Sequence, residues 1–353
     1  MKTTKTILVC VLVTVFGLTS CVKEAIDTPA FESEEVEMTF TTSIPGSSET
    51  QSRALTDADE YTVSGPVKVI AFNAAGNFIY ARDGAVTGVA ANGGNGAGKA
   101  TITFTAQTSG DADVTFVVIA NANTEAAAAI TAASTSTSKA TFFSNTSLVK
   151  TVTAGTAWTA ASIPMHGEVT TKVAVGDAAK SITLKRMLAR ITVKSTPATT
   201  SVAGSFRLKS VNLFNVNSSG FIAPGQTAQS GWAYLQASGS IPYTLTSDET
   251  TAKALERTIY TFERTVPAAS PVILVIGGEY GASSSTTYYK VELMDGATPY
   301  NMTRNSSYNV TINSVSGPGF PEIPDVFTST TTTMSASISA WVDENISVDL
   351  DGI

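Results

Sequence analysis

Hydrophobic and polar residues alternate in two stretches of this chain, one near each end. Because successive side chains of an extended backbone point to opposite faces, each stretch predicts β-strands with one buried face. The first stretch covers residues 36–44, and its inward positions include Val36, Met38, Phe40 and Ile44. The second covers residues 334–353, is interrupted at Asp343-Glu344, and has the larger inward residues Met334, Ile338, Val342, Ile346, Val348 and Leu350.

Further strand patterns occupy much of the chain between these two stretches. The alanine-rich residues 124–133 predict a short helix, and the Gly- and Asn-rich residues 84–99 predict a loop. Apolar runs bounded by Gly, Asn, Ser and Thr predict a hairpin at 65–82 and strands at 100–106, 114–122, 206–215, 258–263, 271–277, 287–293 and 308–315.

The apolar alternation changes phase between residues 181 and 195. Ile182 and Leu184 lie in one phase, whereas Ile191 and Val193 lie in the other. A strand that leaves one sheet and enters the next gives such a change, so we place a domain boundary between residues 185 and 186. The strand spacing predicts an all-β protein with two tandem β-sandwiches, one over residues 36–185 and one over residues 186–353.

The composition favours an extracellular all-β protein. The chain has 353 residues, a length that suits two domains. Charged residues make up only 14% of the chain, while Gly, Ser, Thr and β-branched residues are abundant. The formal net charge is -7 and no basic cluster occurs in the body of the chain, so we expect no nucleic-acid partner.

The N-terminal residues predict a targeting segment. Lys2 and Lys5 precede an apolar run over residues 7–18, which is shorter than the roughly 20 residues of a membrane-spanning helix. The run ends in residues 18–21 (LTSC), which resemble a bacterial lipobox whose cysteine receives lipid. We expect residues 1–21 to be a lipoprotein signal with lipidation at Cys21, and residues 22–35 to be a tether. The alternative for residues 1–21 is an ordinary signal peptide. Since Cys10 and Cys21 are the only cysteines, the mature chain forms no internal disulfide.

The residues after the first strand predict an exposed loop. Pro45-Gly46 ends the strand, and the polar residues 47–52 lead to Arg53 and Ala54. Exposed loops of small polar residues are preferred sites of proteolysis. Arg53 therefore suits cleavage by a trypsin-like protease, and an ordinary surface arginine is the alternative that the residues leave open.

The sequence offers no group of residues that predicts catalysis. His166 is the only histidine, and the acidic residues are scattered, so neither a nucleophile with its base nor a metal site is formed. We expect no enzyme activity, no catalytic residue, no metal and no cofactor, and a structural role for His166. Trp158, Trp232 and Trp341 could stack on sugars, which leaves a non-polymerising, glycan-binding surface lipoprotein as an alternative, although their place beside strand patterns favours core packing.

Five short motifs occur in a characteristic order. They are residues 118–122 (VIANA), 163–167 (IPMHG), 184–190 (LKRMLAR), 259–263 (IYTFE) and 304–310 (RNSSYNV). In order and spacing they resemble the fimbrillins of Bacteroidetes, the FimA/Mfa-like subunits of type V pili. The resemblance covers nearly the whole chain, from the lipobox to the C-terminal alternation.

The resemblance implies a fold and a maturation route. Members of this family have two tandem transthyretin-like β-sandwich domains and reach the outer membrane as lipoproteins. An arginine-specific protease then removes the lipidated N-terminus together with the first strand. On this chain the matching cut follows Arg53, leaves Ala54 as the new N-terminus, and removes residues 36–44.

Removal of this strand would leave an apolar groove with unpaired backbone groups on both sides. A strand from a neighbouring copy or a related pilus subunit fills such a groove, and residues 334–353 have the alternation that a donor strand needs. This head-to-tail contact does not close, so it extends into a fimbria, whose further partner would be a ligand on a host or bacterial surface. An anchor subunit would keep its lipid and a tip subunit would need no donor strand, so the two features together favour a shaft subunit.

Overall fold

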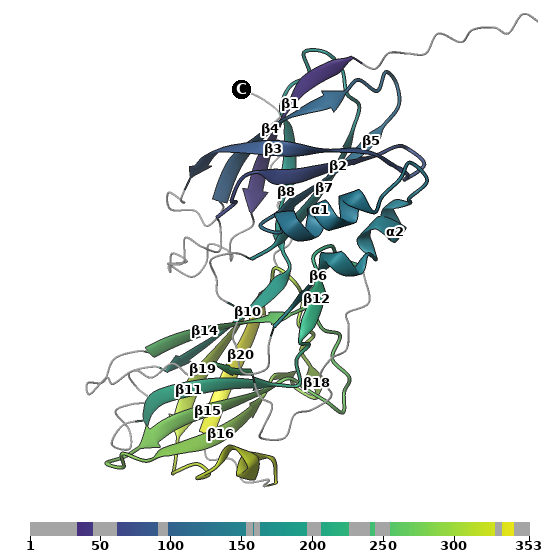
Figure 1. The fold of residues 1–353 in the computed structure, drawn as a ribbon. Coiled ribbons are helices and arrows are strands. Elements are labelled where there is room, and N and C mark those ends of the chain that lie inside the picture. Colours follow the sequence, from purple (N-terminus) through teal and green to yellow (C-terminus); the bar gives the residue numbers. More distant parts are fainter. Residues whose placement is uncertain are drawn as a thin grey trace, which may run out of the picture. The chain divides into compact units, whose positions relative to one another are not determined.

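The computed structural model describes residues 34–44, 62–90, 98–152, 158, 163–195, 206–225, 241–243, 255–328 and 334–341. All of them belong to one compact unit, Glu34–Ile353. The described residues form β-strands in several sheets and two α-helices (Figure 1), which confirms the predicted all-β class. No helix within the described residues is long and apolar enough to cross a membrane.

The first sheet has eight strands in the order β8-β1-β4-β3-β2-β5-β7-β9. Its two end strands, β8 and β9, follow one another in the chain with only Leu184 between them, so the sheet curls and its ends meet. The enclosed core contains Phe40, Ile102, Phe116 and Val118. The strands are β1 (Glu35–Ile44), β2 (Val67–Phe72), β3 (Phe78–Ala90), β4 (Gly98–Gln107), β5 (Val114–Ala120), β7 (Met165–Thr171), β8 (Lys180–Thr183) and β9 (Lys185–Arg186).

Two glycines permit this closure. β3 pairs with β2 as far as Gly84 and with β4 beyond it, and a Cβ at Gly84 would lie 2.6 Å from Cγ2 of Ile102. A Cβ at Gly167 in β7 would lie 2.6 Å from the carbonyl oxygen of Thr183 in β8. Only glycine allows such close approach of backbone to neighbouring strands.

The structure corrects the predicted loop at residues 84–99. Residues 84–90 continue β3, and residues 98 and 99 begin β4. The glycine that suggested a loop instead lets the strand pass from one side of the curled sheet to the other. The remaining residues of the predicted loop, 91–97, lie outside the described part of the chain.

Helices cover the outer face of β2 and β5. The predicted helix is present as α1 (Asn123–Thr131), and α2 (Lys139–Phe143) and the 3-10 helix η2 (Thr146–Leu148) follow it (Figure 1). Their residues pack with Ile70, Phe72, Val117 and Ile119, whereas the alternate residues of the same two strands face the first core. Burial on both faces explains why these strands are apolar except at Lys68 and Thr115, each near the start of its strand.

Two four-stranded sheets enclose a second core. Their orders are β14-β10-β19-β20 and β13-β11-β15-β16, and residues such as Ile191, Leu213, Ile276 and Val310 fill the space between them. The strands are β10 (Leu188–Ser195), β11 (Phe206–Phe214), β13 (Ile241–Tyr243), β14 (Leu255–Phe262), β15 (Ile273–Tyr280), β16 (Thr286–Glu292), β19 (Ser307–Val315) and β20 (Met334–Trp341). Two short pairs, β6 (Val149–Thr151) with β12 (Ser219–Phe221) and β17 (Met294–Asp295) with β18 (Thr298–Pro299), and the 3-10 helix η4 (Ile323–Phe327) complete the described elements.

The chain passes from the first sheet to the second core at the predicted change of phase. β9 ends at Arg186 in the first sheet, and β10 begins at Leu188 in the next one. Because the described residues form a single compact unit, the division into two domains at residues 185 and 186 stays a prediction.

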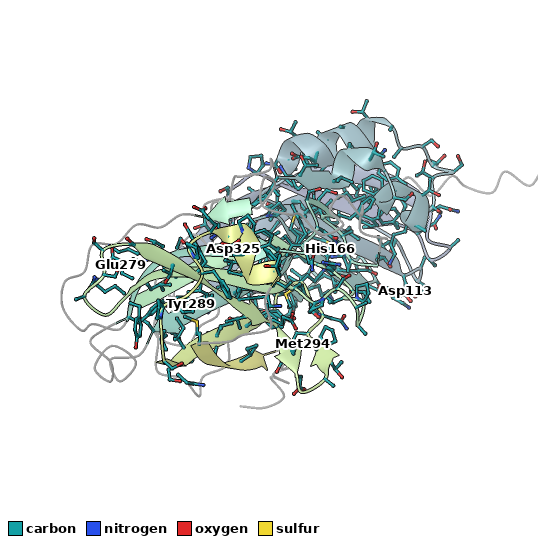
Figure 2. All side chains as sticks on the ribbon, turned by 90° about the horizontal axis from the view of Figure 1, so that it is seen from below. Asp113, His166, Glu279, Tyr289, Met294 and Asp325 are labelled. Atoms are coloured by element: carbon teal, nitrogen blue, oxygen red, sulfur yellow. The ribbon has the colours of Figure 1, made fainter. Side chains whose placement is uncertain are left out.

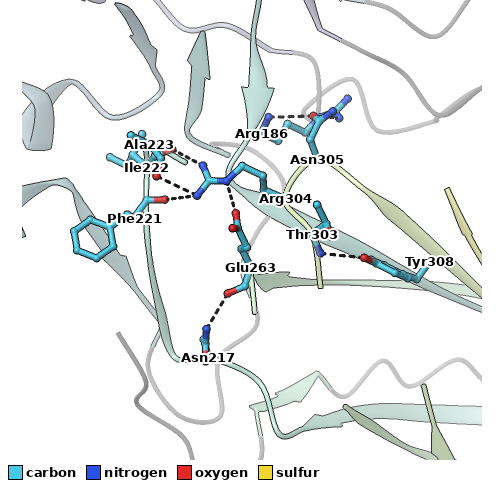
Figure 3. A network of polar contacts seen from close by, with 10 residues as sticks. All are labelled: Arg186, Asn217, Phe221, Ile222, Ala223, Glu263, Thr303, Arg304, Asn305 and Tyr308. Atoms are coloured by element: carbon cyan, nitrogen blue, oxygen red, sulfur yellow. Dashed lines mark hydrogen bonds and ion pairs between the residues drawn. The ribbon is translucent and has the colours of Figure 1, made fainter. Parts of the chain in front are cut away.

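Residues of three sequence motifs form a polar network around Arg304 (Figure 3). The Arg304 guanidinium pairs with the Glu263 carboxylate and donates to the carbonyl oxygens of Phe221, Ile222 and Ala223, with distances of 3.1, 2.8 and 3.2 Å. A planar guanidinium has enough donors to hold all of these acceptors at once. The motif arginine therefore fixes the chain after β12 against the end of β14.

Candidate functional site

The predicted removable strand, β1, lies inside the first sheet and not at an edge. It pairs antiparallel with β4 along its whole length, from Glu35 opposite Gln107 to Ile44 opposite Gly98. On its other side it pairs parallel with β8, from Phe40 opposite Lys180 to Ser43 opposite Thr183. We call the space that β1 fills between β4 and β8 the acceptor groove.

The inner face of β1 contributes to the first core. Met38 is 3% exposed, and Phe40 and Ile44 are fully buried, while Val36 packs against the same core. The centre of the Phe40 ring lies 4.9 Å from the centre of the Phe104 ring and 5.6 Å from that of the Phe116 ring. All four residues predicted for the removable strand therefore share one face and contact the acceptor groove.

The free energy of this burial is large for one strand. Full burial of an apolar side chain of this size contributes about 1.5–3 kcal/mol, so Met38, Phe40 and Ile44 together contribute roughly 5–9 kcal/mol. A folded domain has a net stability of only about 5–15 kcal/mol. A molecule without β1 would thus lose an amount comparable to its whole stability unless another strand took its place.

Thr42 is the one polar residue on the inner face of β1. It is 1% exposed, its Oγ1 donates to the carbonyl oxygen of Ala100 at 2.9 Å, and it accepts from the Ala100 amide at 2.9 Å. Its side chain thus satisfies both backbone groups of one residue of β4. Thr42 is missing from the predicted site residues, although its inward phase between Phe40 and Ile44 is the sequence signal that could have identified it.

The outer contacts of β1 are weaker. Glu35 pairs with Arg82 at 3.0 Å, and the Glu35 side chain is 58% exposed, so solvent screens the pair and it contributes little. The Arg82 guanidinium lies over the Tyr80 ring at 4.9 Å, and Tyr80 accepts from the Gln107 amide at 3.0 Å. Burial of Tyr80 raises the pKa of its hydroxyl, which keeps the group neutral. β1 is therefore held chiefly by its backbone pairing and its inner face.

The first part of the predicted donor segment lies in the molecule's own second core. β20 forms the edge of its sheet and pairs antiparallel with β19, which has a bulge between Ile312 and Ser314. Met334 is 4% exposed, and Ile338 packs against the same core. A donor role for these two residues stays a prediction and requires β20 to leave β19.

Several predicted site residues lie outside the described part of the chain. These are Cys21, Arg53, Ala54, Val342, Ile346, Val348 and Leu350. Of the three tryptophans considered for sugar stacking, Trp158 is partly buried and packs edge-on against Phe262 with 6.0 Å between ring centres. This contact is of the kind found in cores.

His166 lies among packed side chains (Figure 2) and is 8% exposed. Its ring meets the edge of Phe143 at 5.5 Å. Burial lowers the pKa of His166 to about 3, and the positive charges of Arg304, Lys139 and Lys185 act in the same direction. The residue is therefore neutral near pH 7. Within the described residues, no three His, Cys, Asp or Glu side chains are grouped so that they could hold a metal ion.

Comparison with known proteins identifies similar folds. No protein-family model matches the chain, and no curated protein sequence matches it. A protein from Bacteroides eggerthii with a suspected role in cell adhesion matches with a TM-score of 0.52 and 16% identity, over 86% of this chain and 95% of that one. A second protein with a suspected cell adhesion role, from Parabacteroides distasonis, matches with a TM-score of 0.50 and 15% identity, over 87% and 98%.

A fimbrial assembly protein from Parabacteroides distasonis matches with a TM-score of 0.45 and 19% identity, over 79% of this chain and 92% of that one. Identities this low establish similarity of fold and not of activity. The chain thus shares the fold of the first two proteins over most of its length and most of theirs.

Proposed function

We propose that this chain is a subunit of an extracellular fimbria that assembles by strand exchange and supports adhesion. The observation that carries the proposal is β1, a strand with a buried inner face that is paired on both sides with distant segments of the chain. The resemblance of the sequence motifs to fimbrillins supports the same function. So do the suspected adhesion roles of two proteins that share the fold.

Maturation would proceed in three steps. The precursor is exported, lipidated at Cys21 and anchored in the outer membrane. A surface protease specific for arginine then cuts after Arg53, and β1 leaves with the lipidated segment. The mature subunit begins at Ala54 and presents an empty acceptor groove.

The empty groove supplies the driving force for assembly. Its walls keep the apolar side chains and backbone groups that β1 had covered, and their exposure to water is unfavourable. The C-terminal segment of another copy, within residues 334–353, fills the groove and restores the backbone pairing. The donor strand and the acceptor groove are different surfaces of the subunit. Each copy can therefore donate to one neighbour and accept from another, so the filament grows. This use of both surfaces favours the shaft over the anchor or tip of the fimbria.

Limited proteolysis tests the proposal. We expect trypsin to cut the purified chain without residues 1–21 first after Arg53, so that N-terminal sequencing begins at Ala54. The cut protein should then form ladders that resist mild denaturant in gel electrophoresis. The matched control is Arg53→Ala, which should remain monomeric under the same treatment. Cut protein that stays monomeric at high concentration would exclude the shaft function.

A further inference from the structure

The two halves of β1 are paired differently with the rest of the first sheet. β4 pairs with β1 along its whole length, but β8 pairs only with residues 40–43. The Ser43 carbonyl oxygen also accepts from the Leu184 amide at 2.8 Å, just beyond β8. Within the described residues, no strand pairs with residues 35–39 on that side. The first half of β1 is therefore held from one side and the second half from both.

The burial of side chains follows the same division. Glu35 and Glu37 are exposed, and Met38 is the only buried side chain of the first half. The second half buries three side chains, those of Phe40, Thr42 and Ile44. Charged residues are typical of strand edges that have no partner, and in β1 they occur only in the first half. The first half is thus the weaker part of the attachment.

Thr42 makes a contact in the second half that backbone pairing does not supply. The register between β4 and β3 shifts at this point, so that among the described pairs Lys99 and Thr101 have partners in β3 and Ala100 has none. The Thr42 hydroxyl donates to the Ala100 carbonyl and accepts from the Ala100 amide, both at 2.9 Å. Because Thr42 and Ala100 are 1% and 3% exposed, removal of the hydroxyl would leave two buried backbone groups without this partner, which is unfavourable.

We propose that the cut β1 leaves the acceptor groove in a fixed order, from Glu35 towards Ile44, and that Thr42 slows the last step through its bonds to Ala100. The first half opens first because it has fewer backbone partners and buries one side chain. The end that opens first is the end joined to the lipidated segment, and not the end that cleavage creates. Cleavage and release are therefore separate steps. This inference rests on the proposed function and specifies how one of its steps proceeds.

Hydrogen exchange of the intact chain without residues 1–21 tests the order of opening. Residues 40–43 must also break their pairing with β8 before they exchange. We therefore expect the slowest amide of residues 35–39 to exchange at least about tenfold faster than the slowest amide of residues 40–44. Equal exchange in the two halves, or faster exchange next to Ile44, would overturn the order.

Three substitutions test the role of Thr42. Thr42→Val keeps the shape and removes the hydroxyl, Thr42→Ser keeps the hydroxyl, and Thr41→Val is the matched control at the exposed neighbouring position. After trypsin cleavage of dilute protein, mass spectrometry measures the segment ending at Arg53 that has left the folded chain. We expect release from Thr42→Val to be about thirtyfold faster than from the wild type, because two buried polar groups lose their partner. Release from Thr42→Ser should be at most about fourfold faster, the effect of one buried methyl group, and Thr41→Val should behave like the wild type.

The outcomes distinguish the order of release from the function. Equal release rates for Thr42→Val and Thr42→Ser would overturn the role of Thr42. Cleavage that does not occur after Arg53, or a cut chain that never loses its strand, would overturn the proposed function. Exchange in the intact chain would still decide the order in which β1 opens. Cooperative melting of the uncut variants verifies that they fold.

Discussion

Two asparagines show what the sequence motifs contribute. Asn121 and Asn305 have φ values of 59° and 62°, in the left-handed region where asparagine is favoured over most other non-glycine residues. The Asn121 amide donates to the carbonyls of Thr62 and Ile163 at 2.8 and 2.9 Å, and Asn305 Oδ1 accepts from the Arg186 amide at 3.1 Å. Each asparagine thus adopts a left-handed backbone conformation, and its side chain is hydrogen-bonded to the backbone of a segment distant in the sequence. Within the motifs that contain them, these two asparagines therefore have a structural role.

His166 gives a prediction at the same scale. An unfolded chain takes up a proton on histidine near pH 6.5, whereas folded His166 takes it up only near pH 3. Below pH 6.5 the unfolded chain is protonated at this residue and the folded chain is not. The free energy of unfolding therefore falls by about 1.4 kcal/mol for each pH unit between 6.5 and 3, and this residue causes no such loss well above pH 6.5. His166→Leu removes this dependence while keeping an apolar contact with Phe143.

Urea unfolding at pH 7 and pH 5 checks this expectation. The free energy of unfolding of the wild type should fall by about 2 kcal/mol more than that of His166→Leu between these values. Carboxylates titrate in both proteins, so their contribution cancels in the comparison. Equal pH dependence would mean that His166 gains a proton in the folded state as easily as in water.

At the scale of elements, alternation in the sequence located strands but not their partners. Residues 36–44 were predicted as a strand, and β1 spans Glu35–Ile44. Its position between β4 and β8 depends on contacts between residues 58 and 140 positions apart, and such pairing leaves no local pattern. β6 and β12 have three residues each, too few for a period of two to be recognised. Gly84 shows a further limit of sequence-based prediction. It lies inside β3, where the strand passes from β2 to β4, but glycine is also typical of loops, so the sequence predicted a loop there.

Substitutions in β1 test how much of its attachment comes from the inner face. Phe40→Ala removes a fully buried ring that contacts Phe104 and Phe116. We expect it to lower the free energy of unfolding of the uncut chain by about 3–5 kcal/mol. Thr41→Ala is the matched control on the outer face, opposite Thr101, and should cost less than about 1 kcal/mol.

Denaturant unfolding of the two variants measures this difference. Similar losses for both would indicate that backbone pairing, and not the apolar face, holds β1. The same variants report on release, because Phe40→Ala should also speed the loss of the cut strand from the groove.

At the scale of the whole molecule, one apolar cluster joins elements from both halves of the sequence. Phe72, Phe142 and Phe143 pack in the same cluster as Leu188, Ile222 and Phe262, and β6 pairs with β12. A shared core makes the stability of one part depend on the other. We therefore expect the chain to unfold in a single calorimetric transition.

Phe262→Ala tests this coupling. Loss of the buried ring should lower the free energy of unfolding by about 3–5 kcal/mol and divide the transition into two. Phe206→Ala, a comparable loss inside the second core, is the control and should lower the stability of one part without the same division. A single transition in both variants would show that other contacts suffice to join the two parts.

The attachment of β1 to the rest of the chain has a kinetic consequence. While the chain between residues 44 and 62 is intact, β1 competes for the acceptor groove at an effective concentration in the millimolar range, as is usual for tethered partners. A donor strand from another copy making equal contacts would have to reach a similar concentration to displace it. Under the proposed function, the precursor would therefore accumulate densely on a membrane without polymerising. The moment of cleavage, and not the number of subunits, would then set when growth of the fimbria begins.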